Sequence, residues 1–194
     1  MTTDSELATK PTAMDQQAPP APGPDVRVVF VGAGQINFGS PEGPWNHSFR
    51  LEHKLGPRLK VIALIDPVTE NAENVLKKKR ESFVLSAYKD TAIFKDVPSY
   101  LASVTPETRP HVVWVGSPPA FRGSMHAGRD VERVLADSLP GIGLFLEKPV
   151  TTSSVEDVMQ VSRYIEGKMS PLSVGYMPVS YTHLRAHETD SYLV

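Results

Sequence analysis

The sequence predicts an α/β protein built on a doubly wound parallel sheet. Short apolar runs recur at residues 28–31, 59–65, 92–94, 111–115, 142–146 and 172–177, and amphipathic stretches separate them. Nearly continuous apolar runs are typical of parallel strands that are buried on both faces. Alternation of such strands with helices requires right-handed crossovers, which place the helices on the faces of the sheet.

Length and composition are those of an ordinary globular protein. A chain of 194 residues with 40% hydrophobic content can bury one sizeable core. The 20 basic and 22 acidic side chains leave a net charge of −2, so we expect no nucleic-acid partner. No apolar run reaches the roughly 18 residues of a membrane helix, and no secretory signal begins the chain, so we expect no membrane partner. The absence of cysteine excludes disulfides and thiolate metal sites and is compatible with the cytoplasmic location that we expect.

The first strand, residues 28–31, ends at two glycines spaced by one residue. Glycine lets the backbone turn sharply and approach a ligand closely. If a helix follows, its free N–H groups and the positive end of its dipole would hold a pyrophosphate. A tight turn without a ligand is the alternative, and Asn37 replaces the third glycine of G-x-G-x-x-G. The candidate cofactor-binding residues here are Gly32, Gly34, Gln35 and Ile36.

The second strand, residues 59–65, ends at Asp66. A carboxylate at this place can accept hydrogen bonds from both hydroxyls of an adenosine ribose, and it repels a 2′-phosphate, which favours NAD over NADP. The separation between Gly34 and Asp66 is longer than the usual spacing of about 20 residues between the glycine turn and the acidic residue. A loop at 40–44 and a helix expected at about 45–55 lie between them. The alternative is that Asp66 caps the next helix, and the two roles can coexist.

The remaining elements follow in the same alternation. We expect helices at about 69–87, from 97, at 124–135 and from 152, between the strands at 92–94, 111–115, 142–146 and 172–177. The fourth strand ends in Gly116-Ser117-Pro118 and the fifth in Glu147-Lys148-Pro149. Because ligands bind at the carboxyl ends of parallel strands, both loops belong to the candidate site.

These residues resemble the N-terminal nucleotide-binding domain of the Gfo/Idh/MocA oxidoreductase family, a Rossmann fold. The glycine turn is generic, but a Glu-Lys-Pro triplet after the fifth strand is quite specific to that family. The resemblance covers about residues 26–177 and implies NAD(P) binding, with Lys148 close to the nicotinamide and the substrate. Lys148 would orient a hydroxyl or carbonyl oxygen and is the candidate catalytic residue; a surface lysine in a turn is the alternative. The resemblance also assigns four further residues to cofactor binding: Ser117, Pro118, Glu147 and Lys148.

Two departures from the family pattern concern cofactor geometry more than fold. Asn37 places a larger side chain where helix and strand usually pack closely, and Gly116-Ser117 stands where the family more often has Ala-Thr.

The predicted function is that of the NAD-binding domain of an oxidoreductase, which moves hydride between nicotinamide and a CH–OH carbon of a sugar or polyol. NAD is the expected cofactor, with NADP less favoured, and a small-molecule substrate is expected for the full-length protein. A non-catalytic dinucleotide-sensing regulatory protein is the alternative from another class. An unliganded Rossmann domain is a third.

The ends of the chain are predicted to lie outside the domain. Residues 1–24 are polar and proline-rich and are expected to form a disordered arm, so the domain spans 25–177. In the family a second C-terminal domain follows, which we expect to be missing here, and this fragment is therefore expected to be inactive alone. Residues 178–194 resemble a translated sequencing adaptor and are expected to be a non-native or disordered tail.

No metal site is expected. His183 and His187 have the spacing of zinc ligands on one helix face, but a third ligand is not apparent. His47 and His53 would point in different directions from their helix.

Overall fold

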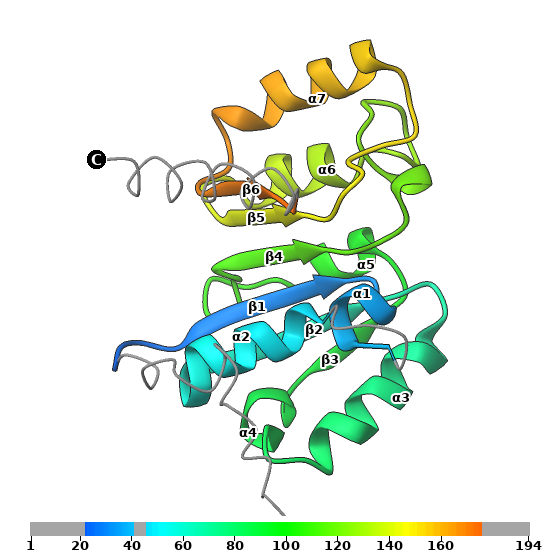
Figure 1. Ribbon diagram of the computed structural model, residues 1–194. Coiled ribbons are helices and arrows are strands. Elements are labelled where there is room, and N and C mark those ends of the chain that lie inside the picture. The colour runs from blue at the N-terminus through cyan, green and yellow to red at the C-terminus, as the bar shows by residue number, and fades with distance from the viewer. Residues whose placement is uncertain (1–21, 41–45, 176–194) are drawn as a thin grey trace, which may run out of the picture.

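The computed structural model describes residues 22–40 and 46–175, which form one six-stranded sheet (Figure 1). Neighbouring strands are all parallel, in the order β3-β2-β1-β4-β5-β6. The strands are β1 (Val26–Val31), β2 (Leu59–Ile65), β3 (Ala92–Phe94), β4 (Val112–Val115), β5 (Gly143–Leu146) and β6 (Leu172–Val174). The chain builds outward from β1 to β3, crosses back to β4 and continues outward to β6. This topology confirms the predicted doubly wound sheet.

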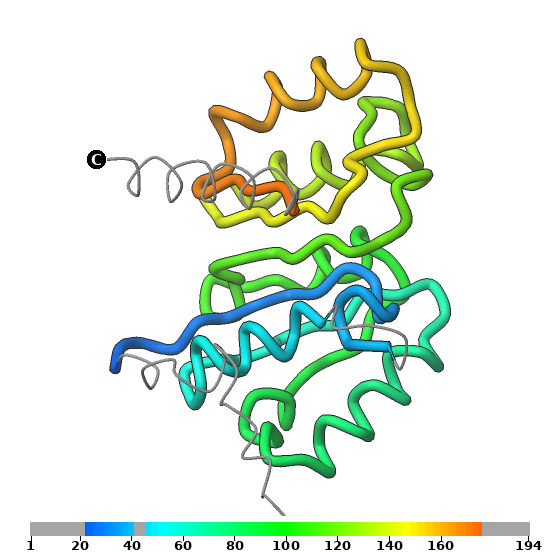
Figure 2. The backbone as a smooth tube through the Cα atoms, viewed as in Figure 1, coloured from blue at the N-terminus to red at the C-terminus, as the bar shows by residue number. Residues whose placement is uncertain are grey.

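Helices cover both faces of the sheet. They are α1 (Gln35–Phe38), α2 (His47–Leu55), α3 (Thr69–Arg80), α4 (Leu85–Tyr88), α5 (Val97–Leu101), α6 (Val131–Ser138) and α7 (Val155–Glu166). Side chains of α2, α3 and α4 pack on one face, and those of α5, α6 and α7 on the other. Figure 2 shows the blue β1 in the middle of the sheet, with the orange β6 toward one end.

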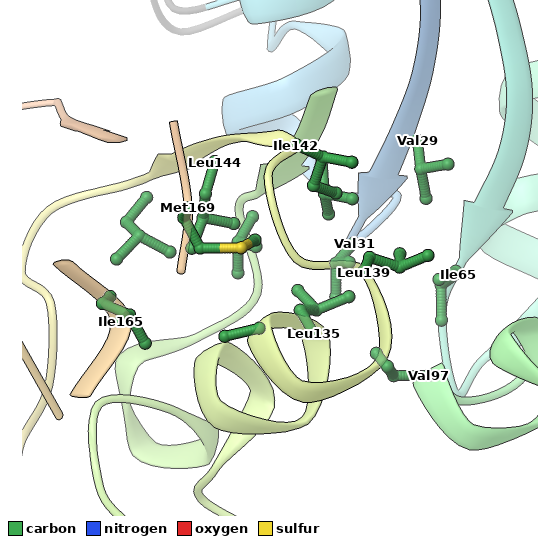
Figure 3. Close-up of a cluster of buried hydrophobic side chains, with 14 of the residues drawn as sticks. Val29, Val31, Ile65, Val97, Leu135, Leu139, Ile142, Leu144, Ile165 and Met169 are labelled. Atoms are coloured by element: carbon green, nitrogen blue, oxygen red, sulfur yellow. The ribbon is translucent and has the colours of Figure 1, made fainter. Parts of the chain in front are cut away.

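Strand β1 contributes to two separate cores. Val28 and Phe30 belong to the core under α3 and α4, whereas Val29 and Val31 belong to the core under α6 and α7. Successive side chains of a strand point to opposite faces, so a strand covered on both sides must be apolar throughout. Figure 3 shows the second core, in which Leu135 of α6 is fully buried. Burying a leucine in this way contributes about 1.5–3 kcal/mol.

Two predicted helices differ from the observed ones. The helix expected at 124–135 begins only at Val131, because Gly128, inside the expected range, adopts a positive φ angle of 82°, which a helix does not allow. The helix expected at 69–87 is divided into α3 and α4. Ser82 lies between them, and its hydroxyl donates to the carbonyl of Lys79, a local bond that competes with continued helix.

Several predictions concern residues outside the described ranges. They include the arm up to residue 21, the loop at 41–45, the end of the sixth strand and the tail at 178–194 with its two histidines. Within the described residues, no helix has the length and apolar character needed to span a bilayer.

Candidate functional site

A cavity of about 720 Å³ lies at the carboxyl edge of the sheet. It opens beside β1 and β4, where the strand order reverses, and such a switch point is where ligands bind in doubly wound sheets. The cavity draws on the loops after four strands and on α5 and α6. Its lining includes the backbone or polar groups of Gly32, Gly34, Gln35, Asp66, Asp96 and Ser117 and the apolar side chains of Ile36, Val97, Pro118, Phe121, Val131 and Val134. Seven of the nine predicted site residues therefore meet in one cavity.

The two glycines of the first turn serve different purposes. Gly32 has a φ of +96°, and a Cβ there would lie 3.0 Å from the backbone nitrogen of Ser117, so both backbone conformation and close packing require glycine. Gly34 has a φ of −81°, and a Cβ there would meet no atom within 4 Å. The fold therefore does not require glycine at position 34, and the open space beside it fits the close approach of a ligand.

The helix after this turn is a single turn long. Helix α1 ends at Gly39, whose φ of +92° breaks the helical path. The first amides of any helix have no acceptor within it, so the N–H groups of Gln35 and Ile36 can face an anion. A helix follows the glycine turn as expected, although it is shorter than the pattern suggested, and its anion-binding role stays a prediction.

Asn37 and Gly116 fit each other. The Asn37 side chain is fully buried, and its Nδ2 donates to the carbonyl oxygen of Gly32 at 2.7 Å. A Cβ on Gly116 would lie 2.5 Å from the same Nδ2 atom. Asn37 thus occupies the space that Gly116 leaves open, and its hydrogen bond to Gly32 stabilises the glycine turn. The two departures from the family pattern compensate for each other, a relation that sequence analysis, which treated them separately, did not find.

Asp66 connects the end of β2 to the glycine turn. Its side chain is 8% exposed and lines the cavity. One carboxylate oxygen accepts a hydrogen bond from the backbone N–H of Ala33 at 2.7 Å, and the other accepts from the N–H of Val68 at 2.9 Å. Val68 is the residue before α3, so this bond closes a local turn, and among the described residues no side chain caps α3 at that position. A carboxylate has about four acceptor positions, so both oxygens retain capacity toward the cavity.

The loop after β4 brings a hydroxyl group to the same site. Ser117 lines the cavity, and its Oγ is buried without a hydrogen-bond partner among the residues that the structure describes. A buried hydroxyl without a partner costs about 1–3 kcal/mol. A polar atom of a ligand would remove this cost, so the site fits a cofactor with hydrogen-bonding groups.

Glu147 and Lys148 lie outside the cavity lining. Glu147 is buried after β5, and its Oε1 lies 2.9 Å from Nε2 of His47, while its Oε2 accepts from the N–H of Lys148 at 2.6 Å. Lys148 is exposed, and the bond between it and Pro149 is cis. Glu147 therefore positions the backbone of Lys148 rather than lining the nucleotide cavity, and their cofactor-binding roles stay predictions.

His47 is a buried residue to which the sequence assigned no function. Its ring lies 5.1 Å from that of Trp114 and 5.0 Å from that of Phe145. Burial lowers the pKa of His47 below 6.5, and the bond to Glu147 opposes this shift. No sequence signal identifies a pair separated by 100 residues. Among the described residues, three or more potential metal ligands do not gather anywhere, so His47 belongs to no metal cluster there.

The parallel sheet, the reversal of strand order between β1 and β4, and the glycine turn at that point define a nucleotide-binding α/β domain of the Rossmann type. The chain belongs to the Gfo/Idh/MocA oxidoreductase family. The model of that family, described as an oxidoreductase family with an NAD-binding Rossmann fold, matches residues 26–176.

The chain is also similar to curated relatives and to solved structures. The uncharacterized protein UNK4.17 of Schizosaccharomyces pombe is 40% identical over 166 residues, which are 84% of this chain and 41% of that protein. The chain thus spans about two-fifths of the length of this relative. GenD2 from gentamicin A biosynthesis, solved in complex with NAD, has a TM-score of 0.55 at 15% identity, over 82% of this chain and 36% of GenD2. The apo scyllo-inositol dehydrogenase of Lactobacillus casei has a TM-score of 0.50 at 15% identity, over 88% of this chain and 43% of that enzyme. Both structures share the fold of this chain.

Proposed function

We propose that the chain binds NAD in the cavity at the carboxyl edge of the sheet, as the cofactor domain of an oxidoreductase. The observation that carries this proposal is the position of Asp66. Its carboxylate lies in the cavity wall, 2.7 Å from the backbone nitrogen of Ala33 and therefore directly beside the glycine turn. A ribose acceptor and an anion-binding turn thus meet in one site, as dinucleotide binding requires.

Each part of the cavity suits one part of the cofactor. The N–H groups of Gln35 and Ile36 and the open space at Gly34 suit the pyrophosphate. Asp66 suits the adenosine ribose, and the buried hydroxyl of Ser117 would hold another polar atom. An apolar surface suited to an aromatic base is formed by the lining residues Val97, Phe121, Val131 and Val134. When bound, NAD supplies the hydride chemistry.

We propose NAD as the preferred form of the cofactor. The charge of Asp66 favours two ribose hydroxyls and disfavours a 2′-phosphate at the same place. Asp96, Asp130 and Lys95 also line the cavity, so the proposed preference depends on Asp66 alone.

For the full-length protein we propose a small-molecule substrate with a CH–OH group, of the sugar or polyol class. Lys148 would orient the reacting oxygen, because its backbone is held by the buried Glu147 while its side chain is exposed. We further propose that the domain spans residues 25–177 and binds cofactor without turning over substrate by itself. The relative UNK4.17 is more than twice as long, which supports a contribution from further parts of such proteins.

Calorimetric titration of the chain with NAD and NADP tests the proposal. We expect saturable binding of NAD, a rise in melting temperature on adding it, and weaker binding of NADP. The absence of both heat and thermal shift with NAD would instead support an unliganded Rossmann domain. Tighter binding of NADP than of NAD would contradict the role given to Asp66.

A further inference from the structure

The proposed function leaves a buried cation unexplained. Arg122 follows the short 3₁₀ helix Pro119–Phe121 and is only 1% exposed. Its Nε donates to the carbonyl oxygen of Ser117 at 2.9 Å, and its Nη1 donates to the carbonyl oxygen of Val150 at 3.0 Å. One guanidinium group therefore joins the loop after β4, which lines the cavity, to the loop after β5, which carries Lys148.

The two loops are also in direct contact beside Arg122. Gly123 has a φ of +74°, and a Cβ there would lie 2.4 Å from Cβ of Thr151 and 2.8 Å from the carbonyl oxygen of Val150. A side chain at position 123 would therefore force the loops apart. The arrangement of Arg122 thus coincides with a packing contact that only glycine permits.

A buried carboxylate completes the junction. Glu132 of α6 is fully buried, and its Oε2 accepts from the backbone N–H of Gly123 at 2.9 Å. Burial raises the pKa of Glu132, whereas that hydrogen bond and the positive charge of Arg122 lower it. Glu132 thus holds the residue that follows Arg122.

Arginine suits this position for a geometric reason. Its planar guanidinium carries five donors in a fixed arrangement, so it can bond two carbonyl groups on different loops at once. Lysine carries a single ammonium group on a flexible stem and cannot reproduce that arrangement. The bonds of Arg122 therefore depend on the relative position of the two loops.

We propose that Arg122 is a positioning residue that couples occupancy of the nucleotide cavity to the position of Lys148. This inference depends on the proposed function, because it takes NAD to bind beside Ser117. A ligand that contacts the Ser117 loop biases the position of the carbonyl that Arg122 bonds. The guanidinium then biases Val150, two residues after Lys148.

The experiment measures how fast the Lys148 amine reacts with an acylating reagent, by peptide mass mapping, with and without saturating NAD. The exposed Lys54 on α2 lies outside the cavity and serves as the internal reference. In the wild-type chain we expect NAD to change the reaction rate of Lys148 by about fivefold, a typical coupling between sites. In Arg122→Lys we expect NAD to bind while its effect on Lys148 disappears. A full effect in Arg122→Lys would mean that NAD acts on Lys148 directly, and it would overturn the proposal.

Two further variants separate coupling from general loosening. His47→Gln disturbs the same loop through Glu147 without touching the bonds to Ser117 and Val150, so we expect it to retain the NAD effect. Loss of the effect in His47→Gln would overturn the proposal. Gly123→Ala retains the guanidinium of Arg122 but separates the two loops, so we expect a smaller effect of NAD on the reaction rate of Lys148. This variant tests the coupling if Arg122→Lys does not fold. If the wild-type chain binds no NAD, the proposed function itself is wrong. If Gly123→Ala binds NAD and the effect on the reaction rate of Lys148 is undiminished, only the proposed coupling is wrong.

Discussion

The replacement Asp66→Asn separates the structural role of Asp66 from its proposed role in cofactor binding. In the structure its two oxygens accept from two backbone N–H groups, those of Ala33 and Val68. Asparagine has only one oxygen, so one of the two N–H groups must face an amide NH₂ group. A buried donor left without an acceptor costs about 1–3 kcal/mol, and we expect a loss of stability of that size. For a domain of this length, each kcal/mol lowers the melting temperature by about 2–4 °C.

We expect Asp66→Asn to weaken NAD binding in addition to its effect on folding. A hydrogen bond to a charged acceptor contributes about 1.5–3 kcal/mol, so we expect the NAD dissociation constant to rise by about tenfold or more. The NADP dissociation constant should rise less or fall, because the carboxylate charge that opposes a 2′-phosphate is gone. Calorimetric titrations at a temperature where both proteins are folded measure the two constants.

Asp96→Asn is the matched control. Asp96 lines the same cavity and caps α5 by accepting from the N–H of Ser99 at 2.7 Å. Asparagine caps a helix about as well as aspartate, so this variant removes one charge from the cavity and changes stability little. We expect its NAD affinity to stay close to that of the wild type. Equal NAD affinity of Asp66→Asn and the wild type would refute the ribose contact and leave Asp66 as a local brace.

Three further predictions test the glycine turn and the buried histidine. Gly34→Ala should leave stability within about 0.5 kcal/mol and yet impair NAD binding, whereas Gly32→Ala should destabilise the domain measurably in urea unfolding, because its φ is +96°. Gly116→Ala should destabilise by about 1–3 kcal/mol, and Asn37→Gly should relieve that loss in the double variant; strictly additive losses would contradict the fit between the two residues. Because burial lowers the pKa of His47, the folded state resists its protonation. The stability that neutral His47 contributes is fully present above pH 6.5 and is lost as the pH falls below that value. The free energy of unfolding then decreases by at most about 1.4 kcal/mol per pH unit. Urea unfolding from pH 7.5 to 5 should show a shallower pH dependence in His47→Gln, and an unchanged slope would contradict this.

The sheet and the first half of the site could be predicted from local patterns. The central strands are apolar runs because both of their faces are buried, as the two cores sharing β1 show, whereas the short edge strands β3 and β6 are partly exposed. The glycine turn and Asp66 could be placed at one edge because carboxyl ends of parallel strands lie together. Periodicity failed where backbone conformation overrode it. The sequence predicts a helix from residue 124, but Gly128 adopts a positive φ angle that excludes a helix there.

The sequence by itself therefore determined the fold class, the order of the strands and seven of the residues that line the cavity. Only the tertiary structure decided which distant residues meet: His47 with Glu147, Asn37 with Gly116 and Arg122 with the backbone of Val150. The physical reason is that periodicity records which face of an element is buried. The partner on that face is set by the crossovers, which bring together residues that no local pattern relates.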